Sequence, residues 1–200
     1  MTAVTRSVTV YYALQSPWTY LGWARWRELA AEAAAEVRYR PIRMAPVFAA
    51  SGGLPLAQRP PQRQAYRLME LKRWRERLRV PLNLHPRHFP VDEALAAAMV
   101  IAHGQAGGDV GRLSQALMAA VWAQERDLAD RPTLLAIAAE QELDGDALLA
   151  VAPSAAVQSE YQANTEAAIA AGVFGVPTFQ IGEELFWGQD RLDFVAAALG

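Results

Sequence analysis

A serine, a proline and a second hydroxyl residue stand together in the stretch Ser16-Pro17-Trp18-Thr19, between a strand-like run and a helical pattern. One interpretation is that Ser16 caps the helix and Pro17 takes its first position, where both residue types are favoured. The other is a reactive corner, because free N–H groups and the helix dipole stabilise an anionic sulfur at a helix start. The chain has no cysteine, so Ser16 could only donate a hydrogen bond to a thiolate that a ligand brings in.

Two later stretches could bind other parts of a small ligand. Val176-Pro177 leads into a strand pattern, and because proline cannot donate to a sheet ladder, it marks an edge or a special turn. Asp190 falls where the last helix begins, and an acidic residue there complements the helix dipole. Alternatively, the free N–H groups of that helix start hold a ligand carboxylate while Asp190 meets an ammonium group. The second interpretation predicts a site for one end of a small zwitterion.

Cationic residues gather between positions 59 and 79, which predicts either a solvated helix face or an anion pocket for a substrate carboxylate. Trp74 within this stretch and Asn83 just after it are candidates to line a substrate pocket. His85 and His88 lack matching carboxylates or cysteines beside them, so we expect no metal site. The cationic residues are Arg59, Arg63, Arg67, Lys72, Arg73, Arg75, Arg77 and Arg79, interrupted by Glu70 and Glu76.

The composition narrows the class of protein. The 200 residues are 52% hydrophobic, which is enough for a sizeable core, and the net charge of −2 gives no reason to expect a nucleic-acid partner. The apolar stretches are too short to span a membrane, and the first residues lack the pattern of a secretory signal. The absence of cysteine excludes disulfides and dithiol chemistry by the protein itself. We therefore expect a cytoplasmic protein with no membrane contact.

Hydrophobic periodicity predicts a strand at 7–12, a helix at 18–35 and a strand at 36–44, which form a right-handed parallel βαβ unit. The stretch 45–61 is rich in proline, glycine and alanine, so we expect a long irregular loop there. A helical region follows, and two strands and a helix end the chain. These later elements are helices at 63–78, 92–103, 111–125, 131–142, 144–151 and 154–171, strands at 178–181 and 184–187, and a helix opening at Gln189.

This order predicts an α/β protein with a thioredoxin fold (βαβ…ββα) that is interrupted by an all-helical insertion. The thioredoxin-like domain would comprise residues 1–45 and 172–200, and the helical insertion domain residues 46–171. In thioredoxin folds the reactive sulfur lies where the first helix begins, which is the position of Ser16. A cis proline stands opposite, so we expect a cis Val176–Pro177 bond that exposes backbone to an extended peptide. An ordinary trans proline in a loop is the alternative.

Six motifs, spread over essentially the whole chain, carry a family resemblance. They are Ser16-Pro17-Trp18-Thr19-Tyr20-Leu21, Lys72-Arg73-Trp74, 81–90, 120–130, Phe174-Gly175-Val176-Pro177-Thr178-Phe179 and 186–192. Together they resemble the 2-hydroxychromene-2-carboxylate isomerases, which belong with kappa-class glutathione transferases and DsbA-like thioredoxin proteins. Each motif alone is weak, but their combination is specific.

The resemblance implies glutathione as the cofactor, a small aromatic carboxylate as the substrate, and a homodimer. It implies that Ser16 hydrogen-bonds the glutathione thiolate, which would add to the conjugated substrate, permit bond rotation and leave again. Val176, beside Pro177, would pair with the cysteinyl part. The γ-glutamyl end would be held by Trp187, Gly188, Gln189 and Asp190.

The sequence departs from the family pattern at two places. Arg63 stands where the family often has a lysine, and it could replace that lysine as an anion partner. Gly53 or Leu54 stands in place of a family asparagine. Two other functions stay open: a conjugating transferase of the kappa type, whose thioether product leaves, and a non-catalytic thioredoxin-like module that binds peptides.

Overall fold

The computed structural model describes residues 6–200 and contains a four-stranded mixed sheet in the order β2-β1-β3-β4. The central strand β1 (Ser7–Tyr12) pairs in parallel with β2 (Glu36–Pro41) and antiparallel with β3 (Thr178–Ile181). Strand β3 pairs antiparallel with β4 (Glu184–Trp187). This sheet confirms the predicted thioredoxin fold. The first five residues of the predicted thioredoxin-like domain lie outside the described residues.

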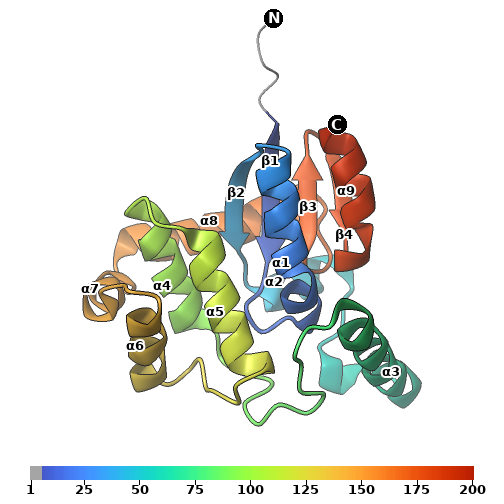
Figure 1. Cartoon of the computed structure of the whole chain (residues 1–200), viewed down its shortest axis with the longest axis horizontal. Helices are drawn as coiled ribbons and strands as arrows, with labels where there is room; N and C mark the ends of the chain where they lie inside the picture. Colours follow the sequence, from blue (N-terminus) through green and yellow to red (C-terminus); the bar gives the residue numbers. More distant parts are fainter. Residues whose placement is uncertain (1–5) are drawn as a thin grey trace, which may run out of the picture.

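Helices cover both faces of the sheet (Figure 1). On one face, α1 (Pro17–Glu32) packs beside α9 (Leu192–Leu199). On the other face, α8 (Ala155–Ala170) packs with α2 (Met44–Ser51). Because alternate side chains of a strand point to opposite faces, β1 contributes side chains to the hydrophobic clusters on both faces of the sheet.

Strand β1 shows this alternation directly. Val10 and Tyr12 join the larger hydrophobic cluster with α1, whereas Tyr11 joins a smaller cluster with Val47 of α2 and Ala168 of α8. Ser7 and Thr9 are polar and only partly buried, so the strand is buried on both faces only at its end, from Val10 to Tyr12.

The inserted segment is helical, as predicted, and most of its helices lie beyond one end of the sheet (Figure 1). Several of them begin at an aspartate or serine whose side chain accepts a hydrogen bond from the first turn, which favours a helix start there. Within residues 6–200, no helix combines the length and apolar character that crossing a bilayer requires. The inserted helices before α8 are α3 (Pro61–Leu78), α4 (Ala94–Gln105), α5 (Val110–Trp122), α6 (Arg131–Glu140) and α7 (Gly145–Val151).

The predicted irregular loop at 45–61 is wrong, because the segment contains α2 and a short 3-10 helix, η1 (Leu56–Gln58). Pro46 lies in the first turn of α2, where a missing N–H costs no helical hydrogen bond. Val47 is fully buried, and Gly52 ends the helix in the left-handed conformation with φ +73°. Burial of one side thus outweighs the loop-like composition.

Several element ends also differ from the prediction by two or three residues, among them the end of α5 at Trp122 rather than at residue 125. The first helix ends at Glu32 rather than at residue 35, since Ala34 has a φ of +47° that a helix cannot continue through. The second strand ends at Pro41 rather than at residue 44, because α2 begins at Met44.

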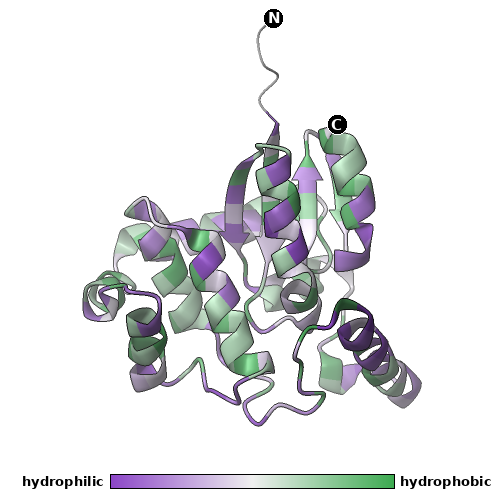
Figure 2. Ribbon diagram, in the orientation of Figure 1, coloured by the Kyte–Doolittle hydropathy of each residue, from purple (hydrophilic) through white to green (hydrophobic). Residues whose placement is uncertain are grey.

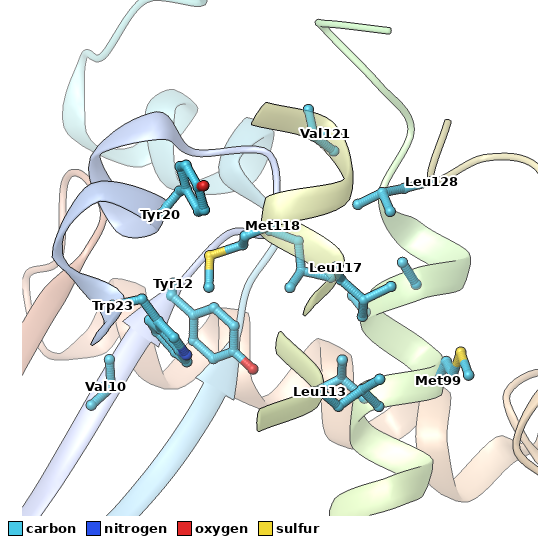
Figure 3. Close-up of a cluster of buried hydrophobic side chains, with 14 of the residues drawn as sticks. Val10, Tyr12, Tyr20, Trp23, Met99, Leu113, Leu117, Met118, Val121 and Leu128 are labelled. Atoms are coloured by element: carbon cyan, nitrogen blue, oxygen red, sulfur yellow. The ribbon is translucent and has the colours of Figure 1, made fainter. Parts of the chain in front are cut away.

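One hydrophobic core connects the sheet with the inserted helices (Figure 3). The rings of Tyr12 and Trp23 lie 4.7 Å apart and face Leu117 and Met118 of α5 (Figure 3). The Tyr12 and Ser114 hydroxyls are 2.8 Å apart, within hydrogen-bond distance. Since α5 is fixed to β1 and α1 in this way, the inserted segment has a defined position relative to the corner at Ser16.

Candidate active site

Ser16 is the N-cap of α1, as the capping interpretation predicts. Its backbone is extended, and its Oγ accepts a hydrogen bond from the N–H of Thr19 at 3.2 Å. Pro17 takes the first helical position and is buried. The capping bond uses a lone pair of the hydroxyl, so the hydroxyl hydrogen can still be donated to a ligand. Capping and ligand binding are therefore compatible roles for Ser16.

A buried acid supports this corner from the inserted segment. Glu93 is 7% exposed, and its two carboxylate oxygens accept hydrogen bonds from Gln15, one from the backbone N–H at 2.8 Å and one from the side-chain amide at 3.1 Å. Burial raises the pKa of Glu93 to about 7, against the opposing effect of these hydrogen bonds. The residue next to Ser16 is thus held by a carboxylate that the sequence did not reveal.

The second predicted part of the site is the segment that precedes β3, which contains Val176 and Pro177. The Val176–Pro177 peptide bond is cis, and the carbonyl of Pro177 accepts from the N–H of Gly188 at 2.9 Å. Thr178 is buried and donates its hydroxyl hydrogen to the carbonyl of Gly175 at 2.8 Å. These bonds fix the proline segment against the start of the last helical region.

That helical region begins with η2 (Gln189–Arg191), which packs tightly on α1. The approach is so close that a side chain at Gly22 would collide with the Cβ of Gln189. Gln189 is 2% exposed, and its Oε1 accepts no hydrogen bond from the described residues. Asp190 is exposed and pairs with Arg191 at 2.8 Å.

A cavity of about 740 Å³ lies between these segments and helix α3. It brings together most of the residues that the sequence singled out, but neither Ser16 nor Pro177 is among its lining residues. Asn83 does not line it either, because its side-chain amide donates to Glu125 at 2.6 Å in a loop. The predicted residues that line the cavity are Arg59, Arg63, Arg67, Trp74, Val176, Trp187, Gly188, Gln189 and Asp190.

The sequence analysis missed a further group of lining residues. Tyr66 and Met69 are about half exposed, at 55% and 49%, which leaves large apolar surface facing the cavity and solvent. Most of the missed residues are on α3. Tyr66 and Glu70 lie at helical spacing from Arg63, and that spacing is the signal that could have found them. The missed residues are Trp18, Gln62, Tyr66, Met69, Glu70 and Arg191.

The cationic stretch divides between the two predicted roles. Lys72, Arg73 and Arg77 are exposed on α3 and form a solvated face. Arg59 and Arg67 are partly buried at the cavity, and burial lowers the pKa of both, that of Arg67 to about 10.

Of the four arginines that line the cavity, Arg191 pairs with Asp190, whereas Arg59, Arg63 and Arg67 form no ion pair within residues 6–200. The two carboxylates of the lining, Glu70 and Asp190, pair with Arg73 and Arg191 instead. The three unpaired arginines therefore leave positive charge at the cavity wall, which favours an anionic ligand.

A second hollow, of about 670 Å³, lies beside β2 and the start of α5. Its lining includes Arg38, Arg40 and Glu160, and it contains none of the predicted site residues. The predicted site residues that line a cavity therefore lie at the one beside α3.

Comparison with protein families matches residues 7–200 to the DSBA-like thioredoxin domain. A 2-hydroxychromene-2-carboxylate isomerase of Sphingobium xenophagum is 30% identical, over 98% of this chain and 99% of that protein. A solved structure of a 2-hydroxychromene-2-carboxylate isomerase matches with a TM-score of 0.77 and 27% identity, over 97% of this chain and 94% of that one. Human glutathione S-transferase kappa 1 is 24% identical, over 100% of this chain and 93% of that protein.

The chain therefore belongs to the 2-hydroxychromene-2-carboxylate isomerase family within the DsbA-like thioredoxin proteins. This result confirms the family and the fold that the sequence motifs predicted.

Proposed function

We propose that the protein is a glutathione-dependent isomerase of 2-hydroxychromene-2-carboxylate-type compounds. The observation that carries this proposal is the single cavity in which Val176, the start of η2 and the unpaired arginines of α3 meet. A backbone edge, a helix start and cations are the groups that bind an extended peptide carrying two carboxylates. The names of the relatives supply the reaction class and support glutathione as the peptide.

The residues present fit glutathione. Val176 would pair through its backbone with the cysteinyl part, and Gly188 to Asp190, with Trp187 beside them, would hold the γ-glutamyl end. The buried Oε1 of Gln189 lacks a donor among the described residues, and a ligand ammonium or amide could supply one. Arg63 is exposed at the cavity and would meet a glutathione carboxylate.

The proposed role of Ser16 is to stabilise a ligand thiolate. Its hydroxyl would donate a hydrogen bond to the sulfur, and the helix start would add the attraction of its dipole. When bound, glutathione supplies a nucleophilic sulfur that adds reversibly to a conjugated substrate and so permits rotation about a former double bond. Trp74 would offer an aromatic face to that substrate, whereas Asn83 could act only by shaping the loop it anchors.

A conjugating transferase is the second candidate, favoured by the full-length similarity to the human kappa-class protein. The consumption of glutathione separates the two functions, because an isomerase regenerates it at each turnover and a transferase does not. By the same resemblance we propose a cytoplasmic homodimer. A non-catalytic peptide-binding module would show neither activity.

Ser16→Ala tests the proposal. Losing a donor to a charged sulfur should slow isomerisation about ten- to a hundred-fold, with glutathione still bound. Steady-state rates on a 2-hydroxychromene-2-carboxylate-type substrate across glutathione concentrations measure this, and the thiolate absorbance of bound glutathione should show a lower thiol pKa in the parent than in the variant. Asp190→Ala should instead weaken glutathione binding with less effect at saturation.

Ser154→Ala is the matched control, since Ser154 caps α8 in the same way and does not line the cavity. It should lose stability but keep the parent rate. Full activity in Ser16→Ala, or parent activity without glutathione, would contradict the proposal.

A further inference from the structure

Arg67 has an unusual position on α3. It comes one helical turn after Arg63 and lines the same cavity, but it is partly buried whereas Arg63 is exposed. Its guanidinium lies over the ring of Phe89 at 5.2 Å and over that of Trp122 at 5.9 Å. Phe89 and Trp122 pack on each other with centroids 4.9 Å apart, and Trp122 is fully buried. Arg67 thus rests on an apolar aromatic wall.

The charge of Arg67 has no counter-charge there. Within residues 6–200 its guanidinium forms neither an ion pair nor a side-chain hydrogen bond. Glu70, the nearest acid along the helix, also lines the cavity, but its carboxylate pairs with Arg73. Burial and the neighbouring Arg59 lower the pKa of Arg67, as expected for a cation without a partner. Buried charges in proteins are normally paired, so an anion from outside the chain would complete this site.

We propose that Arg67 binds the carboxylate of the aromatic substrate, at a subsite separate from the residues that hold glutathione; this inference rests on the proposed function. A guanidinium presents paired N–H groups that match a carboxylate in a bidentate geometry. The ring of the same molecule would lie against the aromatic side chains that line the cavity near Arg67, which are Trp18, Tyr66 and Trp74. The indole N–H of Trp122 beneath Arg67 also lacks an acceptor among the described residues.

Arg63 and Arg67 would bind different carboxylates because they differ in exposure to solvent. Arg63, which is exposed, can meet a carboxylate at the end of a flexible peptide that remains partly in solvent. Arg67, which is set against Phe89 and Trp122, can meet only a carboxylate that enters the cavity together with an apolar body. An aromatic carboxylate has that character, and the free glycine end of a peptide does not.

The experiment uses 2-naphthoate and its uncharged analogue 2-naphthamide as probes, titrated into the whole protein without glutathione and followed by calorimetry. The parent should bind naphthoate at least about ten times more tightly than naphthamide, since only naphthoate can pair with the guanidinium. Arg67→Met, which keeps an apolar stem, should lower naphthoate affinity to that of naphthamide. Arg67→Lys should retain part of the preference, because it keeps the charge without the bidentate geometry.

Lys72→Met is the matched control, because Lys72 is an exposed cation on the same helix and does not line the cavity. It should leave naphthoate binding unchanged. Circular dichroism of each variant verifies the fold, and Arg67→Lys keeps the test informative if Arg67→Met does not fold.

Three outcomes would overturn the inference: equal affinity of the parent for both probes, parent-like naphthoate binding in Arg67→Met, or loss of glutathione binding alone in that variant. The last result would assign the anion to glutathione instead. The protein could also bind naphthoate through Arg67 and yet fail to isomerise its substrate. That result would support the inference about Arg67 and contradict the proposed function, so failure of one proposal can be distinguished from failure of the other.

Discussion

The Ser16 hydroxyl accepts one hydrogen bond from the N–H of Thr19 and keeps its own hydrogen to donate. At the same corner, Gln15 is held by the buried carboxylate of Glu93 through its backbone and its side chain. The geometry of Ser16 therefore depends on an acid that lies 78 residues away from Gln15 along the chain. This dependence gives a residue-scale prediction about pH.

Glu93 should make the protein less stable as the pH rises. Its pKa is raised from 4.5 to about 7 by burial, so the unfolded chain releases this proton at lower pH than the folded chain does. The contribution of Glu93 is therefore fully favourable below about pH 4.5, declines through the window up to about pH 7, and is constant above it. The decline should be on the order of 3 kcal/mol.

Glu93→Gln isolates this effect, because it keeps the size and one acceptor, and the Gln15 amide can rotate to accept from the new amide group. Thermal unfolding of the variant should lack the extra decline between about pH 4.5 and about pH 7 that the parent shows. Glu28→Gln, on the exposed side of α1, should keep the parent's pH dependence. Parallel curves for the parent and Glu93→Gln would show that Glu93 ionises normally in the folded protein.

Local sequence patterns could identify some residues of the candidate site but not others. The sequence singled out Ser16, Val176 and Asp190 as candidates because the local pattern around each of them is distinctive. Glu93 was missed because its role depends on a contact with Gln15 that no local pattern encodes. Arg67 was found only as one of many cations, since its aromatic support comes from the distant residue Trp122.

At the scale of elements, α3 forms one wall of the cavity while being weakly attached to the rest of the molecule. Leu71 is its one buried residue, and most of its surface is hydrophilic (Figure 2). The loop after it is held by two hydrogen bonds: Arg75 of α3 donates to the carbonyl of Leu82 at 2.9 Å, and Tyr20 of α1 donates to that of Pro81 at 2.7 Å. A wall with so little buried apolar surface belongs to the less stable parts of a fold.

The opposite wall is more tightly built, because η2 lies directly on α1 at Gly22. We predict that Gly22→Ala forces Gln189 and Asp190 away from α1, since the added methyl group meets the Cβ and backbone of Gln189. The variant should lose about 1–3 kcal/mol of stability from overpacking. It should also bind glutathione more weakly than the parent. Chemical denaturation and calorimetric titration with glutathione measure the two effects.

Gly104→Ala serves as the control for Gly22→Ala. Gly104 lies in α4, and a methyl group there would meet only a side-chain atom of Val110, at 2.9 Å. The shift that Val110 must make is offset by alanine being the better helix former, so this variant should lose less stability than Gly22→Ala and bind glutathione like the parent. If both variants behave alike, the close packing at Gly22 has no role in positioning η2.

Elements were predicted best where burial follows a simple period. The strands at 178–181 and 184–187 were predicted with the bounds that the structure shows, because each is short and bordered by a turn or a proline. Helix α2 was missed, since its proline and the nearby glycines are typical of loops and only Val47 is buried. A single buried side chain leaves too weak a pattern to outweigh composition.

At the scale of the whole molecule, the predicted thioredoxin-like and helical insertion domains share one hydrophobic core. Tyr12 of β1 lies beside Ser114 of α5, and the indole N–H of Trp23 donates to the carbonyl of Gly111 at 2.9 Å. The cavity also takes its lining from both parts, with Trp18 on one side and Trp74 on the other. We therefore propose that the two parts, although separate in sequence, fold and function as one unit.

The hydrogen bond between Tyr12 and Ser114 can be used to test whether the two predicted domains fold as one unit. Both residues are fully buried and their hydroxyls are 2.8 Å apart, so Tyr12→Phe or Ser114→Ala leaves one buried hydroxyl without a partner. Each change should cost about 1–3 kcal/mol, whereas the double variant should cost clearly less than the sum because no unpaired hydroxyl is left. Urea unfolding should give one transition for parent and variants, with far-ultraviolet circular dichroism and tryptophan fluorescence coinciding. Strictly additive losses would mean that the two hydroxyls do not interact. Two separate transitions would mean that the helical segment is stable independently of the sheet and that the cavity lies between two units free to separate.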